Sequence, residues 1–129
     1  MLGVRKENMV AENKRKTGRE KEELAGEYLC QKGYEILDMN FYGRFGEIDI
    51  IARDSGTLVF AEVKYRKSER LGNPLEAVDT RKQKKICQTA LYYLAKHHIS
   101  DRVPCRFDVI GITGEEITHI ENAFEFQTY

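Results

Sequence analysis

The sequence is organised around one predicted β-hairpin, which spans residues 46–66. Two apolar runs rich in β-branched residues, 48–52 and 58–63, flank the turn signal Asp54-Ser55-Gly56. Apolar runs on either side of a short turn that contains glycine are typical of paired antiparallel strands. Both strands of this hairpin carry charged residues, and a charge inside an apolar strand is costly unless a partner, a metal or a ligand compensates it.

The three charges of interest in the hairpin are Asp49, Glu62 and Lys64. Side chains alternate between the faces of a strand, so Glu62 and Lys64 share a face. A turn centred on Ser55 and Gly56 would place Asp49 opposite Glu62, with Cβ atoms roughly 5 Å apart. Two carboxylates that close repel each other, and Mg²⁺ relieves the repulsion by taking their oxygens as ligands. With Lys64 to orient or deprotonate a water, or to hold a phosphate, the pattern predicts metal-assisted phosphodiester hydrolysis.

A simpler interpretation of the same charges is also open. Asp, Glu and Lys are ordinary at the solvent edge of a two-stranded ribbon, where Lys64 would only neutralise Glu62 or Asp49. The apolar neighbours along both strands favour internal strands instead, because surface strands alternate more cleanly with polar residues.

These residues carry a resemblance to a known group of enzymes. Asp49 followed by Glu62-Val63-Lys64 on the next strand resembles the signature of the PD-(D/E)XK nuclease superfamily, to which restriction endonucleases and archaeal Holliday-junction resolvases belong. More closely, the chain resembles the bacterial YraN-type family of small predicted nucleases over residues 18–121. The motifs are Gly18-x-x-x-Glu22, Asn40-Phe41, Gly46-Glu47-Ile48-Asp49, Val59-Phe60-x-Glu62-Val63-Lys64, Glu76-Ala77-Val78 and Thr80-x-x-Lys82-Gln83-Lys84. The chain departs from the superfamily pattern at Ile48, which stands where the proline of the name would be.

The resemblance implies a metal site and a reaction. It implies that Asp49, Glu62, Glu22 and the main-chain carbonyl of Val63 hold Mg²⁺ or Mn²⁺, and that Lys64 orients the attacking water or stabilises charge on the phosphate. The four catalytic residues would then be the three acids and Lys64. The residues alone indicate that Glu22 is a surface carboxylate. Glu23, the neighbouring acid on the same helix, is the alternative candidate for the metal ligand from this helix.

The resemblance further implies a nucleic-acid substrate, with DNA favoured, and a homodimer that cuts both strands. A non-catalytic nucleic-acid-binding or adaptor protein that keeps the nuclease fold is the alternative function. Three residues near the predicted site are candidates for substrate binding: Lys82, Gln83 and Arg66. Gln83 has a second interpretation as part of a helix cap.

Charge is balanced overall but unevenly distributed. The 21 basic residues match the 21 acidic ones, yet residues 1–21 and 66–85 are rich in Lys and Arg, whereas residues 107–129 contain none. A local basic surface binds phosphate backbones whatever the net charge. The alternative is that these runs are solvated helix faces. Near the hairpin, Tyr42 and Phe45 are either packing anchors, which we favour, or rings that stack on unpaired bases.

The predicted architecture is a single α/β domain with a central mixed sheet flanked by helices in the order αβββαββ, and the resemblance implies that this domain is of the restriction-endonuclease-like type. Residues 1–16 are predicted to be a flexible basic arm, or a frayed first turn, and residues 17–129 the domain. A helix is predicted to begin at Thr17, because Thr17 and Glu20 have capping-box spacing. The first strand is predicted over residues 34–39 and the last over 117–120.

Cysteine usage and hydropathy indicate the compartment. Cys30, Cys87 and Cys105 are odd in number and widely spaced, a pattern typical of reduced thiols rather than of a disulfide framework. No apolar run approaches the ~20 residues of a membrane span, and residues 1–17 lack the apolar core of a signal peptide. The sequence therefore predicts a cytoplasmic protein without membrane contact.

Overall fold

The computed structural model describes residues 6–67 and 73–127 of the 129-residue chain. Helices and strands follow in the predicted order αβββαββ, with one short 3₁₀ helix added before the second α-helix. The elements are α1 (Lys6–Gln31), β1 (Glu35–Gly43), β2 (Gly46–Asp54), β3 (Thr57–Arg66), η2 (Pro74–Ala77), α2 (Thr80–Lys96), β4 (Cys105–Thr113) and β5 (Glu116–Phe124). None of the described helices is long and apolar enough to cross a membrane.

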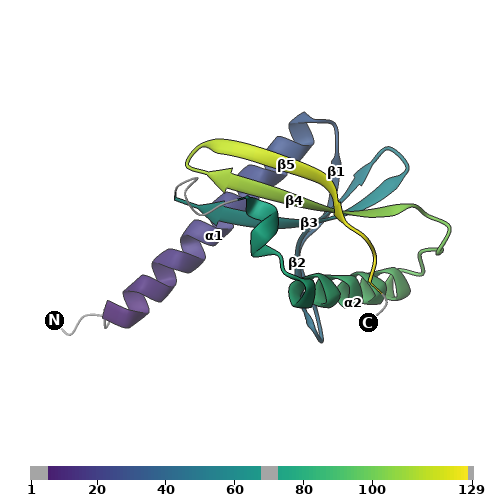
Figure 1. The fold of residues 1–129 in the computed structure, drawn as a ribbon, viewed down its shortest axis with the longest axis horizontal. Helices are drawn as coiled ribbons and strands as arrows, with labels where there is room; N and C mark the ends of the chain where they lie inside the picture. Colours follow the sequence, from purple (N-terminus) through teal and green to yellow (C-terminus); the bar gives the residue numbers. More distant parts are fainter. Residues whose placement is uncertain (1–5, 68–72, 128–129) are drawn as a thin grey trace.

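The strands form one five-stranded sheet in the order β1-β2-β3-β4-β5 (Figure 1). Neighbouring strands are antiparallel except β3 and β4, which are parallel. Parallel strands need a crossover connection, and η2 and α2 provide it between β3 and β4. The prediction of a mixed central sheet is therefore confirmed.

The predicted hairpin forms with the predicted register. Asp54 pairs with Thr57 at the turn, and Ile50 pairs with Ala61 further along β2 and β3. Ser55 in the turn adopts a φ of 55°, in the left-handed region that short turns require. The alternation of side chains along these strands then divides the core between two faces.

Each face of the sheet is covered by one helix, as Figure 1 shows. Ala25 and Leu29 of α1 pack in a cluster with Ile50, Val59 and further apolar residues of the sheet. On the other face, α2 contributes Ile86, Cys87, Ala90 and Tyr93 to a cluster that includes Phe60 and Phe107. Asp49 and Glu62 lie within β2 and β3, between these two layers.

The first helix is longer than predicted. It begins at Lys6 rather than at Thr17, so the Thr17 to Glu20 spacing lies inside the helix and is not a cap. The upstream residues include no glycine or proline between Lys6 and Thr17, and adding turns to an existing helix costs little. Residues 1–5 of the predicted arm lie outside the described residues.

The edges of the sheet also extend beyond their predicted limits. β1 continues to Gly43, which pairs with Gly46, so the aromatic segment after the predicted strand becomes part of a second hairpin. β5 continues to Phe124, whose ring stacks on Phe107 with centroids 4.9 Å apart. Backbone pairing and ring packing both act across strands, which explains why local pattern underestimated these lengths.

Gly111 on β4 allows η2 to lie against the sheet. A Cβ atom at this position would lie 2.1 Å from Cγ of Pro74, and the rigid proline ring cannot move aside alone. We expect Gly111→Ala to lower the free energy of unfolding by about 1–3 kcal/mol, as overpacking does in other cores. Urea unfolding would measure the loss. Gly18→Ala is the matched control, because nothing lies within 4 Å of the added atom. Equal urea midpoints for Gly111→Ala and wild type would contradict the prediction.

Candidate functional site

Asp49 on β2 and Glu62 on β3 lie close together. The paired part of the two strands ends at Ile50 and Ala61, the two acids are the next residue on each strand, and repulsion from Glu62 raises the pKa of Asp49. Asp49 is 5% exposed and Glu62 is 6% exposed, so both carboxylates are buried. The main-chain N–H of Val63 donates a hydrogen bond of 2.8 Å to Oδ2 of Asp49. The next strand thereby holds the Asp49 side chain in place.

Asp49 is a strongly perturbed acid. Burial raises the pKa of Asp49 to about 8, and repulsion from Glu62, Glu22 and Glu47 adds to the effect. The hydrogen bond from Val63 lowers this pKa but does not compensate. Perturbed carboxylates of this kind concentrate at functional sites, where a cation or a proton relieves the repulsion.

Glu22 of α1 reaches the same acids, whereas Glu23 is exposed. Burial raises the pKa of Glu22, and repulsion from Glu47 and Glu62 raises it further, while hydrogen bonds with Asn40 and Asp49 oppose this. Between the two acids that the sequence left open, the structure therefore brings Glu22 to the site. Its place depends on how α1 is rotated against the sheet.

Asn40 is a site residue that the sequence analysis did not single out. It lies on β1 with a φ of 55°, a left-handed conformation that asparagine adopts more readily than most residues. Its side chain contacts Glu22 through a hydrogen bond. The Asn40-Phe41 motif contained this residue, but only the kink in β1 shows that it turns toward the acids.

Two lysines neutralise Glu62. Nζ of Lys82 lies 2.9 Å and Nζ of Lys64 lies 3.5 Å from the same oxygen, Oε1. Burial lowers the pKa of Lys64, and the adjacent Lys82 lowers it further, although Glu62 acts in the opposite direction. Burial alone would lower the pKa of Lys82, but its contacts with Glu62 outweigh burial and raise it. The site thus contains one lysine, Lys64, whose charged form is disfavoured, and a second, Lys82, whose charged form is stabilised.

The donor chemistry of the site fits a hard divalent cation, but this conformation does not complete a metal shell. Carboxylate and carbonyl oxygens are the ligands that Mg²⁺ and Mn²⁺ prefer, and buried acids that repel each other favour a cation between them. Over residues 6–67 and 73–127, no three His, Cys, Asp or Glu side chains are arranged to hold one ion. Here the ammonium group of Lys82 compensates Glu62 instead.

The three predicted substrate-binding residues lie in different surroundings. Lys82 contacts Glu62 inside the site. Gln83 makes its hydrogen bonds to other parts of the chain: its amide nitrogen donates to the carbonyl of Val78 at 2.9 Å and its oxygen accepts from Gln127. Arg66 lies at the end of β3, two positions beyond Lys64, and is paired with Thr113 across the sheet.

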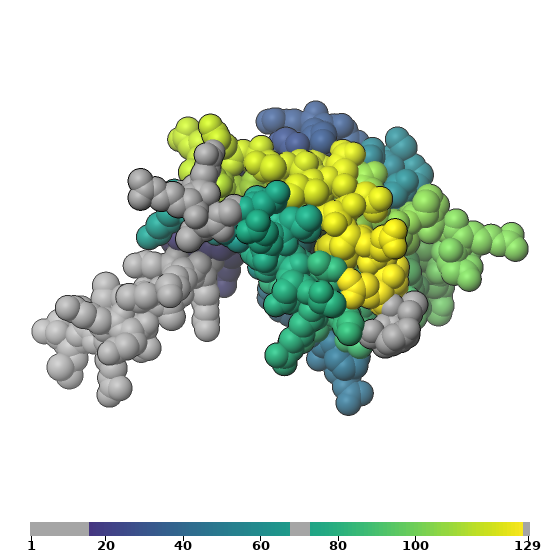
Figure 2. Space-filling model, in the orientation of Figure 1, coloured from purple at the N-terminus to yellow at the C-terminus, as the bar shows by residue number. Residues whose placement is uncertain are grey.

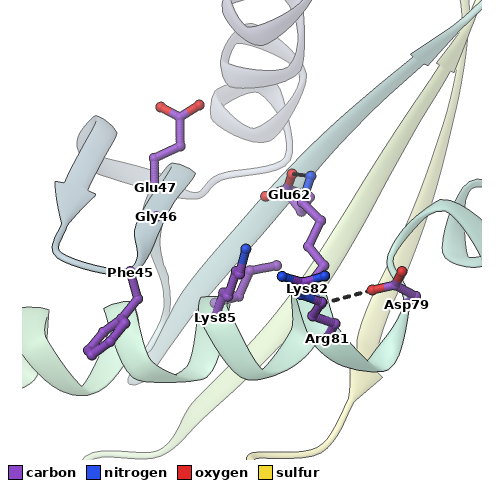
Figure 3. A pocket seen from close by; sticks show the side chains of 9 residues that line it. Phe45, Gly46, Glu47, Glu62, Asp79, Arg81, Lys82 and Lys85 are labelled. Atoms are coloured by element: carbon purple, nitrogen blue, oxygen red, sulfur yellow. Dashed lines mark hydrogen bonds and ion pairs between the residues drawn. The ribbon is translucent and has the colours of Figure 1, made fainter.

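Two adjoining hollows give access to the acids. The larger one, of about 500 Å³, lies between the β1–β2 turn and the first turns of α2, and Figure 3 shows Glu62 and Lys82 approaching each other from β3 and α2 within it. Its lining residues are Phe45, Gly46, Glu47, Glu62, Asp79, Arg81, Lys82, Lys85 and Ile86. The second lies beside α1 and includes Glu22, Asn40 and Arg19. Glu47 lines both hollows, and each of them also carries basic residues.

A second polar cluster surrounds Asp108 on β4, which pairs with Ala61 of β3 and does not line either hollow. This carboxylate is fully buried and accepts hydrogen bonds from Nε2 of His119 at 2.7 Å, Nε of Arg106 at 3.0 Å and the main-chain N–H of Asn122 at 3.0 Å. Nζ of Lys32 lies 3.0 Å from Nδ1 of His119 and can only donate, so Nδ1 accepts this hydrogen bond. The ring hydrogen is then on Nε2, which donates the hydrogen bond to Asp108. The signal that marked Asp49, an acid within an apolar strand, marks Asp108 equally well.

The sequence belongs to a recognised family. A family model described as "Uncharacterised protein family UPF0102" matches residues 21–112, which include Asp49, Glu62 and Lys64. The chain is 49% identical to a UPF0102 protein of Lachnoclostridium phytofermentans, over 88% of this chain and 96% of the relative. It is 49% identical to one of Persephonella marina, over 84% and 92%, and 42% identical to one of Coxiella burnetii, over 87% and 94%. By both its family match and the length over which it resembles these relatives, the chain belongs to the UPF0102 family.

Proposed function

We propose that this protein is a metal-dependent endonuclease of the restriction-endonuclease-like fold, which hydrolyses phosphodiester bonds in DNA with Mg²⁺ or Mn²⁺. The observation that carries the proposal is the convergence of Asp49 and Glu62, two buried carboxylates that repel each other, with Lys64 beside Glu62. Glu22 extends the acid cluster from α1. We propose that the three acids and the carbonyl of Val63 hold the cation.

The roles of the residues follow from their positions. A bound divalent cation would supply a more acidic water and positive charge for the phosphate oxygens. Lys64, whose pKa is lowered chiefly by burial, would orient or deprotonate the attacking water. Arg81 and Lys85 line the hollow in front of Glu62 and would hold the flanking phosphates. Lys82 would leave Glu62 as the cation enters, because both neutralise the same oxygen.

The cellular setting and assembly complete the proposal. Cys30, Cys87 and Cys105 are all free thiols, which agrees with a reducing cytoplasm. A nuclease that cuts both strands needs two sites, so we propose a homodimer on DNA.

Cleavage of supercoiled plasmid and of a synthetic four-way junction tests the function. We expect wild type to cut at least one of them only with Mg²⁺ or Mn²⁺, and Asp49→Ala to cut neither. Glu22→Ala is expected to reduce cleavage by about 10- to 100-fold, as loss of groups around a metal does elsewhere. Its matched control is Glu23→Ala, because Glu23 is an exposed acid on the same helix.

One observation favours the alternative of a non-catalytic nucleic-acid-binding protein. Lys82 forms an ion pair with the oxygen of Glu62 that a metal cation would need. If this ion pair never opens, the protein keeps the fold but cannot bind the metal that cleavage requires. Binding is therefore measured separately, in EDTA. The enzymatic proposal fails, and the alternative stands, if wild type binds DNA but cuts nothing with either metal and the Asp49→Ala variant binds DNA as tightly as wild type.

A further inference from the structure

A third hollow, of about 400 Å³, lies between the β1–β2 turn and the middle of α2. It is lined by Tyr42, Gly43, Arg44, Phe45, Gln88, Thr89 and Tyr92. Its volume falls within the range of small-molecule sites, ~300–1,000 Å³. The β1–β2 turn, which forms one side of this aromatic hollow, projects beyond α2 at the lower edge of the molecule in Figures 1 and 2.

Three aromatic rings stand exposed around the aromatic hollow. Tyr42 is 71% exposed, Phe45 is 52% exposed and Tyr92 is 49% exposed. Rings that serve only as packing anchors would be covered, as Phe41 is between Tyr92 and Tyr93. Clustered exposed rings of this kind mark binding surfaces.

The ring of Tyr92 is held in position from below. It lies on buried Phe41, with ring centroids 5.8 Å apart. Gly43 lets the turn approach closely, because a Cβ there would lie 3.4 Å from Cδ2 of Tyr92 and 3.2 Å from Cγ2 of Thr89. A ring that is already fixed loses little conformational entropy when a ligand stacks on it.

The polar groups of the aromatic hollow identify the chemistry of its ligand. The guanidinium of Arg44 lies over the ring of Phe45, 5.8 Å from its centroid. Gln88 offers an amide, which both donates and accepts hydrogen bonds. No carboxylate lines this hollow within the described part of the chain. Flat π-surfaces with one cation and one amide suit a ligand that has planar rings, polar ring edges and negative charge.

We propose that the aromatic hollow binds unpaired nucleotides, whose bases stack on Tyr42, Phe45 and Tyr92. Bases in a duplex already stack on each other, so only unpaired ones present their faces to protein rings. Phe45 also lines the larger hollow that contains Glu62, Lys82 and Lys85 (Figure 3). A strand that leaves the stacked bases can therefore pass directly to the acids.

This inference deepens the proposed function, on which its link to cleavage rests. It narrows the substrate to nucleic acid with unpaired nucleotides beside the scissile phosphate, such as a branch, a flap or a single strand. An unbroken duplex would meet the acids without occupying the aromatic hollow.

Fluorescence anisotropy with labelled dT20, in EDTA at low salt, tests the binding without cleavage. Tyr92→Ala and Phe45→Ala are each expected to weaken binding by about 5- to 100-fold, the range found for base stacking on aromatic side chains. Tyr92→Phe keeps the ring and is expected to bind as wild type. Leu91→Ala is the matched control, because Leu91 is also 49% exposed on α2 but does not line the aromatic hollow. Circular dichroism checks that each variant is folded.

Several results would overturn the inference. It fails if wild type binds neither dT20 nor rU20, if folded Tyr92→Ala binds both of them as tightly as wild type, or if Leu91→Ala and Tyr92→Phe lose as much as Tyr92→Ala. A loss with rU20 alone would assign the hollow to RNA, and a loss with dT20 alone or with both supports DNA. The two proposals fail separately: ring-dependent binding without any cleavage removes only the endonuclease, and plasmid cleavage without binding of dT20 or rU20 removes only the stacking site.

Discussion

Replacing Asp49 by asparagine is expected to stabilise the protein at alkaline pH. The Asp49 carboxyl has a pKa of about 8 in the folded chain, chiefly because it is buried, against 3.8 as the ordinary value. The unfolded chain therefore releases the proton near pH 4 while the folded chain retains it, and folding becomes less favourable as the pH rises from about 4 to about 8. Asparagine does not titrate, and its oxygen still accepts the hydrogen bond from Val63.

The gain from Asp49→Asn is expected to be small near pH 4 and to reach the order of a few kcal/mol by pH 9, since each pKa unit corresponds to about 1.4 kcal/mol. Urea unfolding at a series of pH values between 4 and 9 measures it. Asp101→Asn is the control, because Asp101 is exposed between α2 and β4. A constant difference across this pH range would show that Asp49 is not a buried acid with a raised pKa.

Metal should reverse this order of stabilities. A cation that binds only the folded state stabilises it by mass action. We expect Mn²⁺ at millimolar concentration to raise the melting temperature of wild type at pH 8 and to leave Asp49→Asn nearly unchanged. Stabilisation of both proteins by the same amount would place the ion elsewhere on the molecule. Functional sites often lower the stability of the fold in this way, because binding a cation requires like charges close together that repel each other in its absence.

Replacing Asp108 by alanine is expected to cost about 3–5 kcal/mol of folding free energy, the usual cost of removing one partner from a buried ion pair. Arg106 would keep Asp54 as a partner, at 3.0 Å, but His119 and the main-chain N–H of Asn122 would each lose an acceptor. Asp108→Asn should lose less, because its oxygen can still accept from the Asn122 amide. Urea unfolding at pH 7 compares the variants with wild type.

The loss in Asp108→Ala should also depend on pH. Burial alone would raise the pKa of Asp108, but the hydrogen bonds from His119, Arg106 and Asn122 outweigh it and lower the pKa below 3.8. The stabilisation by an acid with a lowered pKa is complete above 3.8 and is lost as the pH falls through the folded value. Wild type and Asp108→Ala should therefore converge in strong acid. A difference that persists below pH 3 would mean that packing, rather than charge, dominates the loss.

Local pattern was sufficient for the hairpin that carries the acids. Two β-branched runs around Ser55 and Gly56 determine the register, which pairs Ile50 with Ala61 and so makes Asp49 and Glu62 the next residues on their strands. The strand period of two residues then puts Lys64 beside them. For this part of the site, sequence-local rules and the tertiary fold agree because the partners belong to one continuous hairpin.

Turn signals and strand periodicity could not predict contacts between segments that are distant in the sequence. The sequence could place Lys82 only near a helix start, whereas its ion pair with Glu62 depends on how α2 crosses the sheet. Choosing Glu22 over Glu23 required the rotation of α1 about its axis, and the cluster around Asp108 required a register shift between Phe107 and Val109. The start of α1 was wrong by several turns, because a capping pattern inside a helix resembles one at its end.

The amino-acid sequence by itself determined the order of the elements, the hairpin and the strand positions of the charged residues Asp49, Glu62 and Lys64. The tertiary structure decided which charges meet, which lysine neutralises Glu62 and which rings remain uncovered around the β1–β2 turn. The physical reason is the range of the interactions. Backbone turns and strand periodicity act over a few residues, whereas burial, charge pairing and ring packing depend on segments that only the folded chain brings together.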